Sequence, residues 1–429
     1  MGICDLPDTW REFDVALKSV LLLVALLSSA SVASAQPPAA PAAAGRGGRL
    51  PAVVSPQVNA DRTITLRFRA PNAREVVVIG ETNRKEHPMT RGEDGVWTVT
   101  IGPFAPDVYN YQFRVDGVVA MDPSNPWVKL GFGNFPPANL VSVPGDGLQF
   151  DDAKEVPHGT VRLETYHSKA IGAPRTLWVY TPPGYEEGNQ RYPVLYLLHG
   201  SGNIDSSWVL TGRANYILDN LIAEGKARPM ILVTGLGYGR QGVGTGPERP
   251  GDQQAMGIGA AAPRPAAGAA AAPAGGAGFG AAPGGGQQNS LFAKDLLEDE
   301  IPWMEKHYRV IANADNRAIG GLSMGGGQAI AIGFTRPDIF HNIIVMSAGA
   351  QNAETAYPEF FANPAATNKK LKYLWIGIGK DDFLLANARA LDSSLTAAGI
   401  NHIFRLGEGR HEWVVWRHHL HEVAQALFR

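Results

Sequence analysis

Residues 317–334 read RAIGGLSMGGGQAIAIGF, and this stretch decides the fold. Its centre, Gly321-Leu322-Ser323-Met324-Gly325, matches the pattern G-x-S-x-G of a nucleophile elbow. Residues 317–322 have the apolar pattern of a short strand, and residues 324–334 have that of a helix. The flanking glycines suit a tight turn, because a Cβ there would clash with the strand and the helix. The stretch therefore predicts a strand–turn–helix unit that presents Ser323 as a nucleophile.

A serine needs a base to take its proton, and in this arrangement the histidine follows the serine in the chain. The downstream histidines are His341, His402, His411, His418, His419 and His421. His341 and His402 adjoin the starts of predicted strands, and the last three lie within the C-terminal helix. Only His411 lies in a loop (407–411) between a predicted strand and a predicted helix. That loop leaves the sheet at the edge where Ser323 is expected, so His411 is predicted to be the base.

The third group of the site is an acid that orients the imidazole. A predicted strand at 373–379 ends in Lys380-Asp381-Asp382-Phe383. Both aspartates lie at the correct edge of the sheet, and this pattern alone leaves the choice between them open.

An oxyanion hole needs two backbone N–H donors. Met324, which follows the nucleophile, is expected to supply one of them. The other is expected from the loop after the predicted strand 194–198, which reads His199-Gly200-Ser201-Gly202. Either Gly200 or Ser201 could donate, with Ser201 favoured.

From residue 155 to residue 429, apolar strands alternate with helices. Strands are predicted at 176–180, 194–198, 230–234, 343–346, 373–379 and 402–406. Helices are predicted at 214–223, 291–306, 386–398 and 413–427. Strands as apolar as 194–198 fit a sheet that helices cover on both faces. This half is therefore predicted to be an α/β three-layer domain.

Residues 55–145 follow another pattern, with short alternating runs at 63–69, 75–79, 96–101, 108–115 and 140–143. Turn-forming pairs such as Pro71-Asn72 and Asp116-Gly117 separate them. This spacing predicts a small antiparallel β-sandwich. Trp97 alternates with apolar neighbours and is predicted to lie in its core, which leaves Trp127, Tyr109 and Tyr111 as the aromatic side chains that can be exposed.

Composition narrows the functional class. The chain has 429 residues, a formal net charge of −2, 45% hydrophobic residues and one cysteine, Cys4. A nearly neutral surface argues against nucleic acid or a polybasic membrane contact. A single cysteine excludes an intramolecular disulfide and disfavours a thiolate metal site. No metal or cofactor is expected, and the oligomeric state is left open.

Three segments are expected to lie outside the folded domains. Residues 1–35 resemble an export signal, with Lys18, an apolar run at 20–27 and Ala33-Ser34-Ala35 as the cleavage pattern, so the protein is expected to be secreted or periplasmic. Residues 36–54 read as a Pro/Ala-rich linker. Residues 242–288 are rich in Ala, Gly and Pro and are predicted to be a disordered insertion.

Several segments of residues 159–429 resemble carbohydrate esterase family one, which includes feruloyl esterases and is similar to enterochelin-type esterases. They are YLLHGSG at 196–202, DLLEDEIPWMEKHY at 295–308, GGLSMGG at 320–326, GKDDFL at 379–384 and GRHEWVVW at 409–416. In this family the acid belongs to a G-x-x-D-F pattern, which implies Asp382 here. The resemblance also implies an α/β-hydrolase fold. Residues 55–145 resemble carbohydrate-binding module family 48. This resemblance implies sugar contact through exposed aromatic side chains, with Trp127, Tyr109 and Tyr111 as the candidates, but a non-binding accessory role is favoured.

Together these features predict a serine esterase with Ser323, Asp382 and His411 as its triad, acting on feruloyl or acetyl esters of plant polysaccharides. Trp208 and Trp413 are expected to flank an aromatic acyl group. The alternatives are a siderophore esterase of the enterochelin type and a sugar acyltransferase. A different class of protein, a carbohydrate-binding protein with a vestigial site, also remains open.

Overall fold

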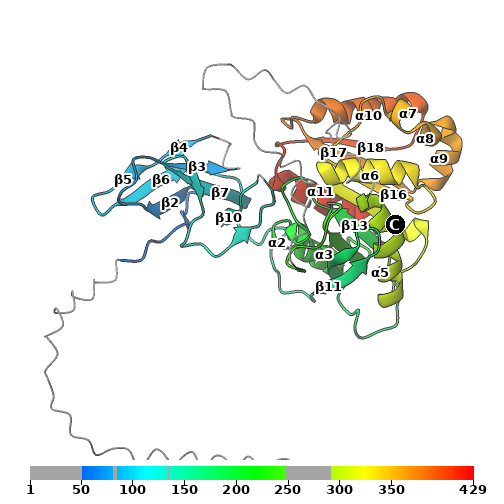
Figure 1. The fold of residues 1–429 in the computed structure, drawn as a ribbon, viewed down its shortest axis with the longest axis horizontal. Helices are drawn as coiled ribbons and strands as arrows, with labels where there is room; N and C mark the ends of the chain where they lie inside the picture. Colours follow the sequence, from blue (N-terminus) through cyan, green and yellow to red (C-terminus); the bar gives the residue numbers. More distant parts are fainter. Residues whose placement is uncertain (1–50, 81–84, 134, 247–290) are drawn as a thin grey trace, which may run out of the picture. The chain divides into compact units, whose positions relative to one another are not determined.

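The computed structural model describes residues 51–80, 85–133, 135–246 and 291–429 (Figure 1). The expected export signal at 1–35, almost all of the linker at 36–54 and most of the insertion at 242–288 lie outside these residues. From Val53 to Arg429 the chain forms one compact unit. Within the described residues, no helix combines the length and apolar character that a membrane crossing requires.

The N-terminal part of this unit is a β-sandwich, as predicted. One sheet has the order β1 (Gln57–Val58), β2 (Ile64–Arg69), β6 (Val96–Ile101), β5 (Thr90–Arg91). The other has the order β4 (His87–Pro88), β3 (Val76–Gly80), β7 (Asp107–Val115), β10 (Ala138–Val143), β9 (Val128–Lys129), with β8 (Val118–Ala120) paired to β7. The five longer strands match the predicted runs to within about two residues, whereas the short strands were not predicted.

The sandwich core explains which aromatic side chains are available at its surface. Trp97 is buried among Ile64, Leu66 and Phe113, which confirms its predicted place in the core. Tyr111, predicted to be a candidate for sugar contact, is fully buried, and its hydroxyl donates to Asp122 Oδ2 at 2.8 Å. That prediction was wrong, because the inward face of β7 carries Tyr111 into the core.

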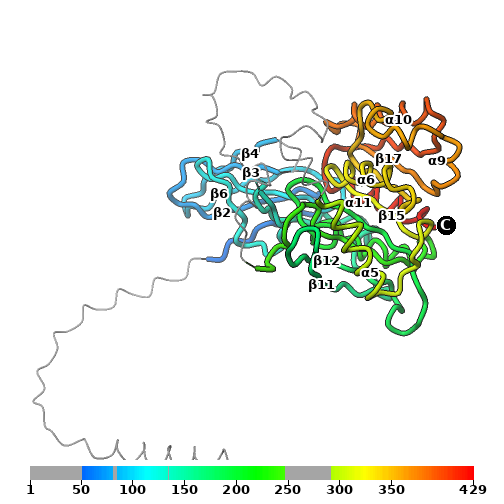
Figure 2. The backbone as a smooth tube through the Cα atoms, turned by 45° about the vertical axis from the view of Figure 1, so that its right-hand side comes forward, coloured from blue at the N-terminus to red at the C-terminus, as the bar shows by residue number. Residues whose placement is uncertain are grey.

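The C-terminal part is built on one eight-stranded sheet. Its order is β11 (Thr160–Ser168), β12 (Ala173–Thr181), β14 (Ile231–Gly235), β13 (Val194–Leu198), β15 (Arg317–Leu322), β16 (Asn342–Met346), β17 (Tyr373–Gly379), β18 (Ile403–Gly407). Figure 2 labels β11, β12, β15 and β17 of this sheet along the backbone trace. β11 and β12 pair antiparallel, as do β12 and β14, and all later pairs are parallel. β11 was not predicted, because it is a half-exposed edge strand with few buried side chains.

Helices cover both faces of this sheet, as predicted for a three-layer domain (Figure 1). One face packs against η3 (Leu296–Glu300), α5 (Ile301–His307), α6 (Met324–Thr335) and α10 (Leu385–Ala398). The other packs against α2 (Ser207–Leu210), α3 (Ala214–Ala223) and α11 (Trp413–Ala426). The shorter helices are η4 (Ala314–Asn316), α7 (Ala353–Ala356), α8 (Pro358–Ala362) and α9 (Pro364–Lys370).

The central strands are apolar on both sides, so the two cores share them. Along β13, Leu195 and Leu197 join the core that contains α3 and α11, while Tyr196 and Leu198 join the core that contains α6. Since the strands from β13 to β18 are parallel, the residues that follow them emerge at one edge. Because helices cover both faces of the sheet, the carboxyl edge of its parallel strands is where side chains can contact a ligand.

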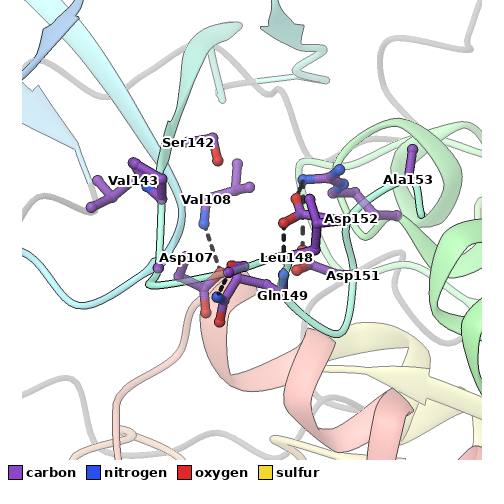
Figure 3. Close-up of a pocket in the computed structure, with 13 residues that line it drawn as sticks. Asp107, Val108, Ser142, Val143, Leu148, Gln149, Asp151, Asp152 and Ala153 are labelled. Atoms are coloured by element: carbon purple, nitrogen blue, oxygen red, sulfur yellow. Dashed lines mark hydrogen bonds and ion pairs between the residues drawn. The ribbon is translucent and has the colours of Figure 1, made fainter. Parts of the chain in front are cut away.

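Arg417 links α11 to strand β7 of the sandwich. Its side chain is fully buried and donates to Asp107 Oδ1 through Nε at 3.1 Å and also through a terminal nitrogen. It donates as well to the carbonyl oxygens of Thr211 at 3.1 Å and Val108 at 2.5 Å. Beside this link, Asp107 and Asp151 line a cavity of about 590 Å³ (Figure 3). The two parts are thus joined through a buried ion pair.

Candidate active site

Ser323 occupies the turn between β15 and α6, as the sequence predicted. Its backbone has φ 52° and ψ −115°, an unusual conformation for a residue with a Cβ. Its backbone N–H donates to Met346 O of the neighbouring strand at 2.8 Å. A Cβ at Gly321 would lie 2.6 Å from the carbonyl carbon of Gly325, so the turn requires glycine there. The strained turn holds the serine at the carboxyl edge of the sheet.

His411 and Asp382 meet at the same edge. Asp382 follows β17, and His411 lies between β18 and α11. His411 Nδ1 is 3.0 Å from Asp382 Oδ1 and 2.9 Å from Oδ2. Because a carboxylate only accepts, Nδ1 carries the hydrogen, which leaves Nε2 as the basic nitrogen of the neutral ring. Asp382 is buried and accepts from Leu384 N at 2.9 Å, whereas Asp381 is exposed.

A cavity of about 390 Å³ lies beside Ser323 and His411, whereas Asp382 is not among its lining residues. Ser323, His411, Gly200, Ser201 and Trp413 all line it. Its remaining described wall comes from Leu322, Asn203, Phe383 and Trp416 and, from the sandwich, Gly80, Asn110, Lys129 and Phe135. The sandwich therefore forms part of the cavity around Ser323, which no pattern in the sequence indicated.

The loop after β13 is fixed by His199, which is fully buried. Its Nε2 accepts from Gly237 N at 2.9 Å, so its Nδ1 carries the hydrogen and donates to Gly200 O at 2.9 Å. Burial lowers the pKa of His199 to about 4, so the ring stays neutral and keeps this tautomer. In a trans peptide the carbonyl and the next N–H point in opposite directions, so this bond also fixes the N–H of Ser201.

The two tryptophans expected at the substrate have different positions. Trp413 lines the cavity, although little of its surface is exposed. Trp208 is fully buried, donates from Nε1 to Leu198 O at 3.0 Å and packs edge-on against Trp413. It does not line the cavity, so its expected contact with an acyl group is corrected. Its indole instead occupies the core beneath the loop that follows β13.

The β9–β10 hairpin of the sandwich packs onto the loop after β13. Phe132 stacks on Tyr238 with ring centroids 4.7 Å apart, and the Tyr238 hydroxyl accepts from Gly202 N at 2.8 Å. A Cβ at Gly202 would collide with the ring of Phe135. These contacts explain how Lys129 and Phe135 come to line a cavity whose nucleophile lies almost 200 residues further along the chain. No local sequence motif identifies Lys129 and Phe135 as cavity residues, because packing between elements that are distant in the sequence brings them to the cavity.

A buried ionic cluster supports the loop that carries Tyr238. Arg175 lies 3.0 Å from Asp295 Oδ2 and donates to the carbonyl oxygens of Leu236, Tyr238 and Arg240. Glu300 is also buried here, and its Oε2 has no hydrogen-bond partner. Burial, with the nearby charge of Asp295, raises the pKa of Glu300 to about 8 against the opposing effect of Arg175. Glu300 is therefore protonated at neutral pH.

This raised pKa predicts a pH-dependent loss of stability. Between pH 4.5 and about 8 the unfolded chain releases the proton of Glu300 while the folded protein retains it, so stability falls as pH rises. Glu300→Gln removes this effect. The free energy of unfolding, measured by urea titration from pH 5 to 9, should change in favour of the variant by about 1.4 kcal/mol per pH unit and level off above pH 8. Glu298→Gln, an exposed change on the same helical segment, is the control. Parallel curves for Glu300→Gln and the wild type would contradict the prediction.

Within the described residues, no group of three or more His, Cys, Asp or Glu side chains is arranged to hold a metal ion.

The eight-stranded sheet and the strand–Ser323–helix turn define an α/β hydrolase. Comparison with protein families agrees with this class. The model described as "Putative esterase" matches residues 168–250 and 260–427, and the chain belongs to this family. Carbohydrate-binding module 48, described as the isoamylase N-terminal domain, matches residues 52–127. The chain thus belongs to an esterase family and carries a sandwich of this second type at its N-terminal side.

Individual relatives extend these matches. An endo-1,4-beta-xylanase/feruloyl esterase of Xylanibacter ruminicola is 31% identical over 391 residues, covering 87% of this chain and 46% of the relative. A 1,4-alpha-glucan-branching enzyme of Yarrowia lipolytica is 41% identical over 76 residues, 17% of this chain and 9% of the relative. The chain spans less than half the length of either. The enterobactin esterase of Shigella flexneri has the same fold, with a TM-score of 0.58, 17% identity and coverage of 86% and 94% of the two chains.

Proposed function

We propose that Ser323 is the nucleophile, His411 the general base and Asp382 the residue that orients the imidazole of a serine carboxylesterase. The observation that carries this proposal is the pairing of His411 Nδ1 with Asp382, together with a positive-φ Ser323 that lines the same cavity as His411. The hydrogen on Nδ1 leaves Nε2 to take the proton of the Ser323 hydroxyl. The buried carboxylate then stabilises the imidazolium that forms.

The reaction proceeds in two steps of acyl transfer. Ser323 Oγ bonds to the ester carbonyl carbon as its proton moves to His411, and the alcohol leaves with that proton. Water then gives a proton to His411 as its oxygen attacks the acyl carbon, and His411 returns that proton to Ser323 Oγ as the acid is released. The backbone N–H of Met324, with that of Ser201 or Gly200, stabilises the oxyanion in both steps. The neutral, buried His199 supports the Ser201 donor by holding the Gly200 carbonyl.

The substrate that we propose is a feruloyl or acetyl ester of a plant polysaccharide. The relative named as a xylanase/feruloyl esterase supports the feruloyl assignment. Trp413, Trp416, Phe135 and Phe383 give the cavity an aromatic wall suited to a hydroxycinnamoyl ring. Polymeric substrates lie outside the cell, which fits the expected export signal at 1–35 and a secreted or periplasmic enzyme.

Hydrolysis of three esters tests this assignment. The aromatic wall predicts that kcat/KM for methyl ferulate exceeds that for methyl acetate, which has the same leaving group, by at least about tenfold. p-Nitrophenyl acetate serves as the activated control for the catalytic residues themselves. Turnover of p-nitrophenyl acetate without turnover of methyl ferulate would keep the mechanism and reject the feruloyl substrate. Transfer of the ferulate to an added sugar in place of water would identify an acyltransferase.

A further inference from the structure

A second cavity, of about 380 Å³, lies along the edge strand β11. Its described wall comes from β11, from the segment after β12 and from the end of α5, which lies beside β11 (Figure 1, Figure 2). Three strands separate β11 from β15 in the sheet, which is a distance of about 19 Å at roughly 4.8 Å per strand. None of its described lining residues lines the cavity around Ser323. The two cavities are therefore separate.

Aromatic rings form much of this wall. Trp303, Tyr185 and Tyr308 line the cavity, and the indole of Trp303 stacks on the imidazole of His307 with ring centroids 4.3 Å apart. Trp303 is half-buried, so its ring is held in place by the core. Its Nε1 has no hydrogen-bond partner among the described residues, and this atom is open to solvent. The wall thus combines aromatic carbon with an available N–H donor.

Two carboxylates of the wall are held by neighbouring side chains. The hydroxyl of Tyr308 donates to Glu164 Oε1 at 2.6 Å, and Arg162 pairs with Glu186 Oε1 at 2.5 Å. Neither glutamate uses its other oxygen, Oε2, in a hydrogen bond with the described residues. A carboxylate oxygen accepts up to two hydrogen bonds. Both glutamates therefore bring spare acceptors to the cavity in fixed positions.

The charges of the described wall balance, which limits the class of ligand. Two arginines, Arg162 and Arg309, match the two glutamates, and Arg309 lies over the ring of Tyr185. A polyanion such as nucleic acid needs an excess of cations, which this wall lacks. A neutral ring with several hydroxyl groups can donate to the carboxylates and accept from the guanidinium and indole groups. Its C–H face can also pack on an aromatic ring, and a sugar has both features.

We propose that this cavity is a second binding site, for a neutral polysaccharide chain, apart from the site of ester hydrolysis. It holds the enzyme on a polymer while Ser323 acts on esters attached to that polymer, which raises the local concentration of ester. The inference goes beyond the proposed function, because binding at this cavity does not require that any ester is cleaved. Only the choice of a plant polymer as the probe rests on the proposed substrate.

Affinity electrophoresis of Ser323→Ala through gels that contain soluble arabinoxylan tests the binding, since this variant leaves the esters of the polymer intact. The polymer should retard the protein. Trp303→Leu and Glu186→Ala, each added to Ser323→Ala, should weaken the affinity by about fivefold or more. Glu187→Ala is the matched control, because Glu187 is also exposed and carries the same charge but does not line the cavity.

The variants separate recognition from a loss of folding. Trp303 packs partly against the core, so thermal midpoints must show that Trp303→Leu is folded. Glu186 is exposed, and Glu186→Ala tests the cavity even if Trp303→Leu does not fold. Absence of retardation in Ser323→Ala, or equal retardation in Glu186→Ala and Glu187→Ala, would overturn the proposal. Retardation that is lost only in Trp127→Ala would assign the sugar contact to the sandwich and would also overturn it.

Hydrolysis gives an independent readout when Ser323 is intact. The ratio of kcat/KM for feruloylated arabinoxylan to kcat/KM for methyl ferulate should fall several-fold in Glu186→Ala and stay unchanged in Glu187→Ala. An equal ratio in the two variants would contradict a role for the cavity in holding the polymer. A wild type that cleaves neither ester would reject the proposed hydrolysis, and the gel experiment would still decide whether the cavity binds the polysaccharide.

Discussion

Ser323→Ala should lower kcat for p-nitrophenyl acetate by about 10⁴- to 10⁶-fold while the protein keeps its fold. The variant loses the only atom that forms the covalent bond to the acyl group, and His411 alone cannot replace it. Backbone donors such as Met324 N remain, so a small residual rate above that of water is expected. Steady-state rates and the p-nitrophenol burst of an acyl-enzyme measure the effect, and the burst should be absent from the variant.

A second serine provides a matched control for this experiment. Ser347 follows β16, the strand beside β15, and also has a positive φ, 48°. Its Oγ accepts from Trp416 Nε1 at 2.9 Å, and it does not line the cavity. Ser347→Ala should therefore retain most of the activity. A Ser323→Ala enzyme within tenfold of the wild type would contradict the assigned nucleophile.

Arg417→Met should destabilise the protein by about 3–5 kcal/mol at pH 7. Arg417 is the buried counterion of Asp107 and lies 3.6 Å from Asp151, so its loss leaves two buried carboxylates without this charge. Burial opposes ionisation of Asp107, yet His418 and Arg417 outweigh it and hold the pKa of Asp107 below its ordinary value. The aspartate is therefore ionised at neutral pH and needs its counterion. Urea midpoints of the two proteins measure the loss.

The double variant Asp107→Leu/Arg417→Met distinguishes a buried charge from simple loss of packing. Removal of both partners replaces the ion pair with apolar groups and should recover a large part of the stability lost in the single variant. The exposed pair Arg62–Asp146 supplies the comparison, since Arg62→Met should cost at most about 1 kcal/mol. Equal losses for the single and double variants at Arg417 would reject this explanation.

The residues that the sequence located correctly are those that a local pattern defines. β15 and the start of α6 lie where the glycines and apolar runs around Ser323 predicted them, and β17 ends just before Asp382. Asp382 itself was chosen over Asp381 through a family resemblance, and the hydrogen bond to His411 agrees with that choice. These positions could be predicted because parallel strands bring their carboxyl ends to a common edge.

The residues that the sequence did not locate depend on packing between distant segments. Lys129 and Phe135 belong to the sandwich and reach the cavity only because the β9–β10 hairpin packs on Tyr238 and Gly202. Trp208 was expected at the cavity because it lies close in sequence to Gly200. The helical turn of α2 instead places it in the core. Residues that are close in sequence need not line the same cavity, and the hydrophobic periodicity of the sequence does not show which of them do.

The Arg417–Asp107 pair also limits which sandwich domains could replace residues 55–145 of this protein. Removal of residues 55–145 would remove Asp107, which is the counterion of the buried Arg417 in α11. It would also remove the part of the cavity wall that the sandwich supplies. A sandwich from another protein could replace it only if it carried an acid at the position of Asp107 and a hairpin able to reach Gly202. The sandwich and the catalytic domain would therefore be inherited together, as one unit.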